Sequence, residues 1–206
     1  MSHNEQQPNK DNNKEDRVLY RITIDMRTLN SATRNDTTIV LPTIESIERD
    51  FHGCNITTLD LSNMFYNIKV HRNSTRFFNF YVEELVWTHE ALPQGWCASP
   101  KLARDAMIIT FAPEVMQDYM KENNLSAEDF SFRDYDQILK QFVDDLAIFT
   151  KRTTLKSYKG KFTASELHLL AVDSVFYALA RFGWLISLRK STIRRTALYS
   201  QEPPGT

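Results

Sequence analysis

Two adjacent carboxylates, Asp144 and Asp145, lie in the middle of the otherwise apolar run Gln141–Phe149. The β-branched and aromatic residues around them predict two short strands, with the aspartates at or beside the turn. Because a buried, unpaired carboxylate is costly, such a pair must either face solvent or hold cations. Carboxylate oxygens suit a hard divalent ion such as Mg²⁺, which keeps positions open for water and substrate phosphates. The plainer alternative is an ordinary Asp-Asp hairpin turn.

A third carboxylate, Asp60, ends the apolar strand predicted for Ile56–Leu61. Neighbouring strands of one sheet would bring Asp60 beside the Asp144-Asp145 pair, where the like charges repel one another unless a cation lies between them. Two metal ions on shared carboxylates can hold the attacking and leaving oxygens of an in-line phosphoryl displacement. The three aspartates therefore favour a phosphoryl or nucleotidyl transfer site.

Length and composition favour a single folded domain. The chain has 206 residues, of which 42% are hydrophobic, and its 25 Lys and Arg against 26 Asp and Glu give a net charge of −1. This is enough apolar material for one core. Because proteins that bind phosphate backbones usually carry a basic excess, any nucleic-acid surface must be local. Basic residues gather in the last quarter of the chain.

The cysteine pattern and the lack of a targeting segment predict an intracellular protein, cytoplasmic or nuclear. Cys54 and Cys97 match no zinc spacing, and both are expected as small core residues rather than a disulfide. No apolar stretch is long enough to span a membrane, and no signal peptide opens the chain.

The elements that must position the aspartates follow from hydrophobic periodicity and turn residues. Residues 1–16 are expected to be a disordered leader, residues 17–200 the folded domain, and residues 201–206 a disordered tail. Expected strands cover 18–26, 56–61, 67–70, 76–88, the hairpin at 142–149, 184–188 and 196–199, with a polar loop at 30–38.

Three helices are predicted between these strands. One begins at Pro42-Thr43, and one begins at Ser99-Pro100, with Ser99 as its cap, and runs to about residue 123 with a kink or break at Pro113. The third begins at the capping box of Thr163 and Glu166 and ends at Gly183. A short capped helix is also expected at Ser126. The resulting order predicts an α+β fold with helices over one face of a sheet.

Four sequence motifs give the chain a family resemblance. In their order and approximate spacing they resemble retroelement and retrovirus-like reverse transcriptases over residues 18 to about 200. The motifs are Tyr20–Asn30, Leu59–Leu61, Leu92–Trp96 with Ser99-Pro100, and Phe142–Asp145. The resemblance implies a ferredoxin-like βαββαβ palm with part of the fingers, and with no thumb or ribonuclease H region.

The resemblance also assigns roles to charged residues. It implies that Asp60 and Asp144 are the principal ligands of two Mg²⁺ ions, with Mn²⁺ as a substitute, and that Asp145 is a supporting carboxylate. Arg21 falls where the family grips the incoming triphosphate, which suits the fork of a guanidinium. Lys190 matches the residue that would protonate the pyrophosphate leaving group.

Two uncharged residues also match the family's nucleotide pocket. Phe65 occupies the steric-gate position, where a flat ring excludes a ribose 2′-OH, although an ordinary core position is the simpler interpretation. Gln94 matches a residue that lines the pocket, with a surface loop amide as its alternative.

The implied reaction is template-directed transfer of a deoxynucleotide to a primer 3′-hydroxyl. The partners would be an RNA or DNA template with its primer, a dNTP, and other parts of a retroelement polyprotein or a second subunit. One alternative is a domesticated or truncated retroelement fragment that acts as a non-catalytic binding or scaffold module. A second is the palm of an RNA-templated RNA polymerase, which bulky Phe65 disfavours.

Overall fold

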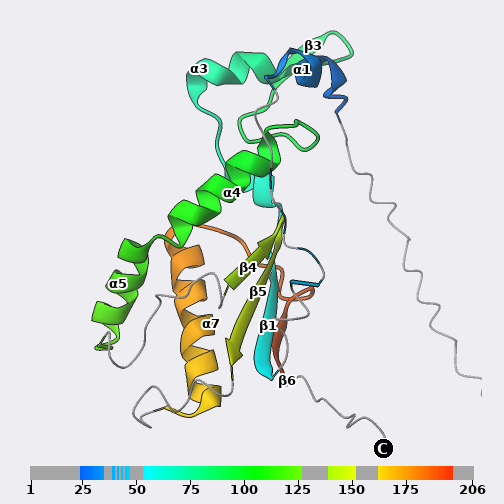
Figure 1. Ribbon diagram of the computed structural model, residues 1–206. Coiled ribbons are helices and arrows are strands. Elements are labelled where there is room, and N and C mark those ends of the chain that lie inside the picture. Colours follow the sequence, from blue (N-terminus) through cyan, green and yellow to red (C-terminus); the bar gives the residue numbers. More distant parts are fainter. Residues whose placement is uncertain are drawn as a thin grey trace, which may run out of the picture.

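The computed structural model describes residues 24–34, 39, 41, 43, 45–46, 53–126, 139–151 and 162–196. Its centre is a four-stranded antiparallel sheet with the strand order β4-β5-β1-β6, covered on one face by helices (Figure 1). The strands are β1 (Cys54–Asp60), β4 (Leu139–Phe142), β5 (Asp145–Lys151) and β6 (Thr192–Thr196). In chain order the unit is β1-α4-α5-β4-β5-α7-β6, which confirms the ferredoxin-like βαββαβ palm.

The register of β1 against β5 decides which side chains face the helices. Leu59 pairs with Leu146, and Asp60 pairs with Asp145, without a slip along the strands. Leu59 and Leu146 are buried in the main core together with apolar residues of α7. Because side chains alternate along a strand, Asp60 and Asp145 belong to the opposite face of the sheet, which we call the far face.

Helix α7 (Ala164–Arg181) lies along the sheet and begins at the predicted capping box (Figure 1). The Thr163 N–H donates to Glu166 Oε2 at 2.6 Å, and the Glu166 N–H donates to Thr163 Oγ1 at 3.3 Å. Gly183 follows the helix with a φ of 73°, a conformation that glycine adopts without steric cost. Both predicted ends of this helix are therefore confirmed.

A buried histidine joins α7 to the two central strands. The ring of His168 is 1% exposed, and its Nε2 and Nδ1 lie 2.9 Å from the hydroxyls of Thr57 and Thr150 respectively. Both ring nitrogens therefore have partners inside the protein, as buried polar groups require. Sequence reasoning gave this histidine no role.

The helix expected at Ser99 is two helices, α4 (Ser99–Thr110) and α5 (Pro113–Glu122), so the chain breaks at the predicted proline. Proline suits the first turn of α5, where its missing N–H leaves no hydrogen bond unmade. The predicted cap of α4 is wrong: Ala98 holds the cap position, and the Ser99 hydroxyl instead donates to the Pro93 carbonyl at 2.7 Å.

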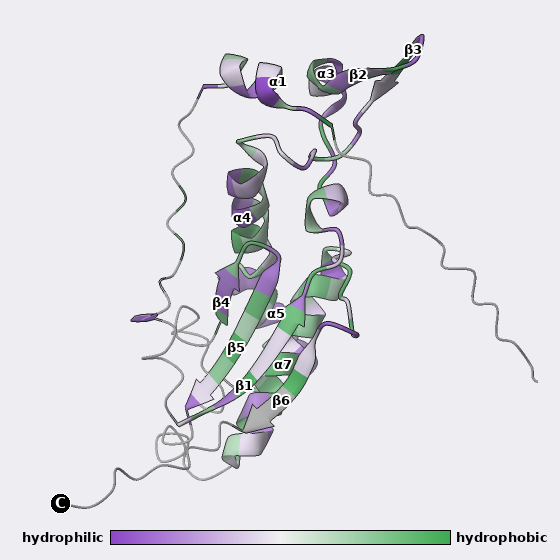
Figure 2. Ribbon diagram, turned by 90° about the vertical axis from the view of Figure 1, so that its right-hand side faces the viewer, coloured by the Kyte–Doolittle hydropathy of each residue, from purple (hydrophilic) through white to green (hydrophobic). Residues whose placement is uncertain are grey.

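Most of the remaining elements form what we call the fingers segment, at one end of the molecule (Figures 1 and 2). They are α1 (Arg27–Ala32), α3 (Arg72–Thr75), η2 (Arg76–Phe78), β2 (Asn79–Val82) and β3 (Leu85–Thr88). In the hairpin β2–β3 every residue except Phe80 is exposed. The short helix η1 (Met64–Asn67) follows β1 and packs against the main core.

Several expected elements differ from the structure. Residues 27–32 form a helix, although residues 30–38 were predicted to be a loop, and Ile24–Met26 are not in the strand predicted for 18–26. Residues 67–70 make only an isolated bridge, between Lys69 and Ala91, and residues 184–188 only one, between Ile186 and Leu61. The last strand is Thr192–Thr196, earlier than predicted, because it pairs with β1 there.

Other expectations are partly or wholly outside the described residues. These include the leader at 1–16, the tail at 201–206 and most of the short helix expected at Ser126. Within the described part of the chain Cys54 and Cys97 form no disulfide, as expected, and Cys54 is buried. Within the described ranges, no helix combines the length and apolar character needed to cross a membrane.

Candidate active site

The site begins where β1 and β5 end side by side. Asp60 and Asp145 are directly opposite each other in the antiparallel ladder, so their side chains leave the same face of the sheet. Beyond this pair the Leu61 N–H donates to the Asp144 carbonyl at 2.9 Å, which holds the turn against β1. The fold thus brings together the three aspartates that the sequence singled out.

The turn that carries Asp144 is strained. Val143 has a φ of 56°, in the left-handed region that β-branched residues rarely adopt. The Gln141 side-chain amide donates to the Val143 carbonyl at 3.0 Å and so supports this conformation. Backbone strain of this kind persists where surrounding contacts enforce it, and it is frequent at functional sites.

The electrostatics of the cluster fit a bound cation. The pKa of Asp145 is raised, first by burial and then by the charges of Asp144 and Asp60, while Lys190 acts in the opposite direction. Carboxylate oxygens that repel one another at the edge of a sheet are the donor set that Mg²⁺ prefers. Within the described ranges, however, no three Asp, Glu, His or Cys side chains lie close enough to form a ready metal site. The aspartate side chains would therefore need to rotate to share an ion.

Lys190 reaches the site from a turn that precedes β6. Its Nζ lies 3.3 Å from Asp60 Oδ1, across 130 positions of sequence. The Lys190 side chain is 70% exposed, whereas that of Asp60 is 13% exposed. The structure thus places the predicted proton donor beside the carboxylates.

The loop that presents Gln94 is held by α1. The Asn30 side chain donates to the Gly95 carbonyl at 2.9 Å, and its oxygen accepts from the Cys97 N–H at 2.8 Å. The Trp96 indole donates to Thr33 Oγ1 at 2.9 Å. We call the two hydrogen bonds of Asn30 the Asn30 clasp. Together with the Trp96–Thr33 bond they hold the backbone from Gly95 to Cys97, directly after Gln94, which is partly buried.

The other two predicted residues are placed less fully. Phe65 belongs to η1 and packs against the main core, which agrees with its simpler interpretation as a core residue and leaves the steric-gate role a prediction. Arg21 lies outside the described residues, so its role also stays a prediction.

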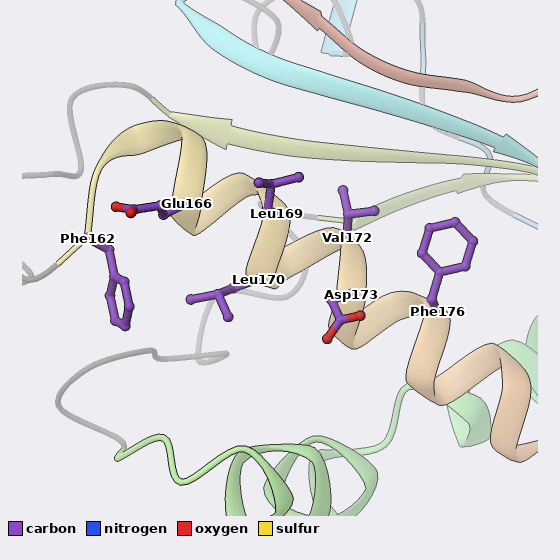
Figure 3. Close-up of a pocket in the computed structure, with 7 residues that line it drawn as sticks. All are labelled: Phe162, Glu166, Leu169, Leu170, Val172, Asp173 and Phe176. Carbon is purple, nitrogen blue, oxygen red and sulfur yellow. The ribbon is translucent and has the colours of Figure 1, made fainter.

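Two hollows help to locate the accessible side of the site. One, of about 320 Å³, opens beside Asp145 and is lined by far-face residues that include Thr58, Phe142 and Ala147. The other, of about 540 Å³, lies along α7 between Phe162 and Phe176 (Figure 3). Since α7 covers the opposite face of the sheet, only the first hollow is next to the aspartates.

Sequence reasoning missed the residues that hold the site together. Asn30 stands at the end of the motif Tyr20–Asn30, which was its only signal. Ser191 is the acceptor of the Asp60 N–H at 3.1 Å, and nothing in the sequence near residue 191 marks it. Asn30 and Ser191 each form hydrogen bonds with residues that are distant in the sequence, and such contacts are seen only in the folded structure.

The sequence model of the family described as "Reverse transcriptase (RNA-dependent DNA polymerase)" matches residues 8–201. A Gag-Pol polyprotein of Walleye dermal sarcoma virus is 33% identical over 91 residues, which are 43% of this chain and 5% of that protein.

Solved structures show the same fold. A foamy viral protease-reverse transcriptase in complex with double-stranded DNA matches with a TM-score of 0.62 and 22% identity, over 85% of this chain and 25% of that one. The native prototype foamy virus protease-reverse transcriptase matches with a TM-score of 0.55 and 21% identity, over 84% and 19% of the two chains. The chain thus spans a quarter or less of each of these relatives.

Proposed function

Because the chain belongs to the reverse transcriptase (RNA-dependent DNA polymerase) family, we propose that it forms the palm and part of the fingers of an RNA-templated DNA polymerase. The observation that carries this proposal is the pairing of Asp60 with Asp145 at the end of β1, with Asp144 in the adjoining turn. Three carboxylates from two distant segments meet at one accessible edge, which suits the transfer of a nucleotide to a primer 3′-hydroxyl.

Asp60, Asp144 and Asp145 would hold two Mg²⁺ ions. When bound, the ions would lower the pKa of the primer hydroxyl and neutralise charge on the phosphate oxygens. The carboxylates concentrate negative charge at the far face, and the strained turn keeps Asp144 against β1. Lys190 would donate a proton to an oxygen of the departing pyrophosphate, because its ammonium already lies at the carboxylates.

The nucleotide pocket would be formed by residues of the fingers segment, the short helix η1 and the loop that carries Gln94. Gln94, held by the Asn30 clasp, would contact the incoming dNTP, and Phe65 would exclude a ribose 2′-OH. Arg21 would bind the triphosphate. Template and primer would be held mainly through their backbones, with sequence supplied by base pairing. The foamy viral relative in complex with double-stranded DNA supports a nucleic-acid partner.

The alternative, a non-catalytic module, is favoured by one observation. Asp60 has a cationic partner within the chain, Lys190, so its carboxylate can be stabilised without a metal. A protein of this kind would keep the palm fold and bind nucleic acid or another protein without chemistry.

Primer extension on an RNA template separates the two. With Mg²⁺ and dNTPs we expect the primer to lengthen, and with ribonucleotides we expect extension to fall strongly. Phe65→Ala should then admit ribonucleotides, whereas Phe77→Ala, at an exposed ring of the fingers segment, should not. Tight binding of primed template without any extension would contradict the polymerase and favour the module.

A further inference from the structure

The turn Ser187–Ser191 is hydrogen-bonded to β1 at Asp60, which is the least exposed of the three aspartates. The Ser187 N–H donates to the Asp60 carbonyl at 2.9 Å, and the Asp60 N–H donates to Ser191 Oγ at 3.1 Å. The Ser191 hydroxyl in turn donates to the Ser187 carbonyl at 2.8 Å. The N–H and the carbonyl of Asp60 are therefore both hydrogen-bonded to this turn. The Ser191 hydroxyl takes part in two of the three bonds, because it accepts from Asp60 and donates to Ser187.

This fastening sets where Lys190 emerges. The N–H groups of Lys190 and Ser191 both donate to the Ser187 carbonyl, at 3.1 and 3.0 Å, so the turn is tightly closed. From it the Lys190 ammonium lies 3.3 Å from Asp60 Oδ1. A long, flexible side chain loses rotamer freedom when it is held at one partner, and a rigid turn means that no further backbone freedom has to be lost.

The pair is asymmetric in its exposure to solvent. The Asp60 side chain is 13% exposed, but that of Lys190 is 70% exposed. The ammonium can therefore move into water without any change in the fold. A divalent cation that binds Asp60 would lie at the same carboxylate whose Oδ1 Lys190 now faces, and the two positive charges would repel each other.

We propose that Lys190 and a divalent cation compete for the Asp60 carboxylate, and that the Ser191 hydroxyl is a positioning residue that holds Lys190 in this competition. The inference rests on the metal site of the proposed function. It means that Lys190 leaves Asp60 when the site is loaded, and its ammonium is then available to a phosphate oxygen of the substrate. Binding of the cation at Asp60 and release of the Lys190 ammonium from Asp60 therefore occur together.

Binding of Mn²⁺ to the whole chain, followed by the electron paramagnetic resonance of the free ion, tests the competition. Lys190→Gln should bind Mn²⁺ about 3- to 10-fold more tightly, an effect that solvent exposure keeps moderate. Ser191→Ala should shift in the same direction by a smaller factor, and Ser191→Thr, which keeps a hydroxyl, should return toward wild type. Lys121→Gln, an equal loss of charge on α5, is the matched control. Equal affinities for Lys190→Gln and Lys121→Gln would overturn the proposal.

A second measurement examines the contact without metal. The reactivity of Lys190 toward an acylating reagent, read by mass spectrometry against Lys121, should rise in Asp60→Asn and, in the wild type, on addition of Mn²⁺. An unchanged reactivity in Asp60→Asn would overturn the contact whatever the metal does. If Asp60→Asn bound Mn²⁺ like wild type, the competition and the metal site would both fail. Primer extension can fail on its own, so the two proposals remain distinguishable.

Discussion

The palm and the fingers segment of this chain are stabilised in different ways. In the palm, Leu146 and Ile148 are fully buried between the sheet and α7. In the hairpin β2–β3, Tyr81 is 77% exposed and Trp87 is 53% exposed. A two-stranded hairpin of this kind has little stability of its own. The difference teaches that packing fixes the strands that carry the aspartates, whereas the loop that carries Gln94 also depends on the hydrogen bonds of the Asn30 clasp.

The largest contrast should come from equal truncations in the two regions. Leu146→Ala removes buried atoms and leaves a cavity, so it should lower the free energy of unfolding by about 2–5 kcal/mol. Val86→Ala, at an exposed position of β3, should change it by less than about 0.5 kcal/mol. Chemical denaturation of both variants measures this. Similar losses would show that the hairpin is packed in solution.

A second contrast concerns hydroxyl contacts. His168→Leu removes the ring nitrogens that contact the Thr57 and Thr150 hydroxyls inside the palm, and it should destabilise the palm by about 1–3 kcal/mol. In the hairpin, the exposed Thr88 hydroxyl donates to Asn79 Oδ1 at 2.6 Å, and Thr88→Val should cost less because water replaces the bond. Denaturation midpoints of the two variants should differ accordingly, and a reversed order would contradict the comparison.

The same difference explains how much of the structure could be predicted. The palm elements β1, β5 and α7 were predicted from periodicity, and α7 also from its capping box. Strand β4 begins at Leu139, before the predicted hairpin at 142–149. Helix α1 has no buried residue, so no apolar stripe marks it. The apolar run after Gly183 resembles a strand, but Trp184 is instead fixed by its indole, which donates to Thr110 Oγ1 at 2.8 Å.

Within the site, the residue types could be predicted but their partners could not. The acidic pair Asp144-Asp145 within an apolar run predicts a turn between two strands, and the family motifs connect this pair with Asp60. The contacts of Asp60 with Lys190 and Ser191 cross about 130 positions, and short-range patterns contain no information about such pairs. The strain at Val143 is equally hidden, because it depends on the fold around the turn.

The Asn30 clasp should affect the nucleotide more than stability. Asn30→Ala removes two hydrogen bonds to the loop at Gly95 and should raise the KM for dNTP by about tenfold, since a neutral hydrogen bond contributes about 1 kcal/mol. Ser31→Ala is the matched control, because that hydroxyl donates to the nearby Thr28 carbonyl of its own helix. Faster amide exchange at residues 94–97 in Asn30→Ala alone would locate the effect, and an unchanged KM would contradict it.

The smallest expected effect depends on pH. The folded protein raises the pKa of Asp145, so the folded state binds its proton more readily than the unfolded chain does. Ionised Asp145 therefore costs stability above its folded pKa, and this cost disappears once the pH falls below the ordinary carboxyl range. Asp145→Asn should stabilise the fold at neutral pH by less than about 1 kcal/mol, because the group is partly exposed. The gain should vanish in acid.

The hairpin again provides the control for this pH effect. Glu84→Gln at the exposed tip removes a charge of the same sign, and its stability should follow that of wild type across the titration. A gain for Glu84→Gln equal to that for Asp145→Asn would mean that net charge, rather than the aspartate cluster, is responsible.

Incorporation of a single dNTP on a primed RNA template, measured for wild type and Asp144→Asn, tests the central claim most directly. We predict incorporation by wild type and a loss of at least about a hundredfold in Asp144→Asn, because an amide cannot hold a cation as a carboxylate does. Asp118→Asn on α5, which also removes one carboxylate but far from the turn, should retain activity. Equal incorporation by wild type and Asp144→Asn would contradict the assignment of the aspartate cluster as the active site.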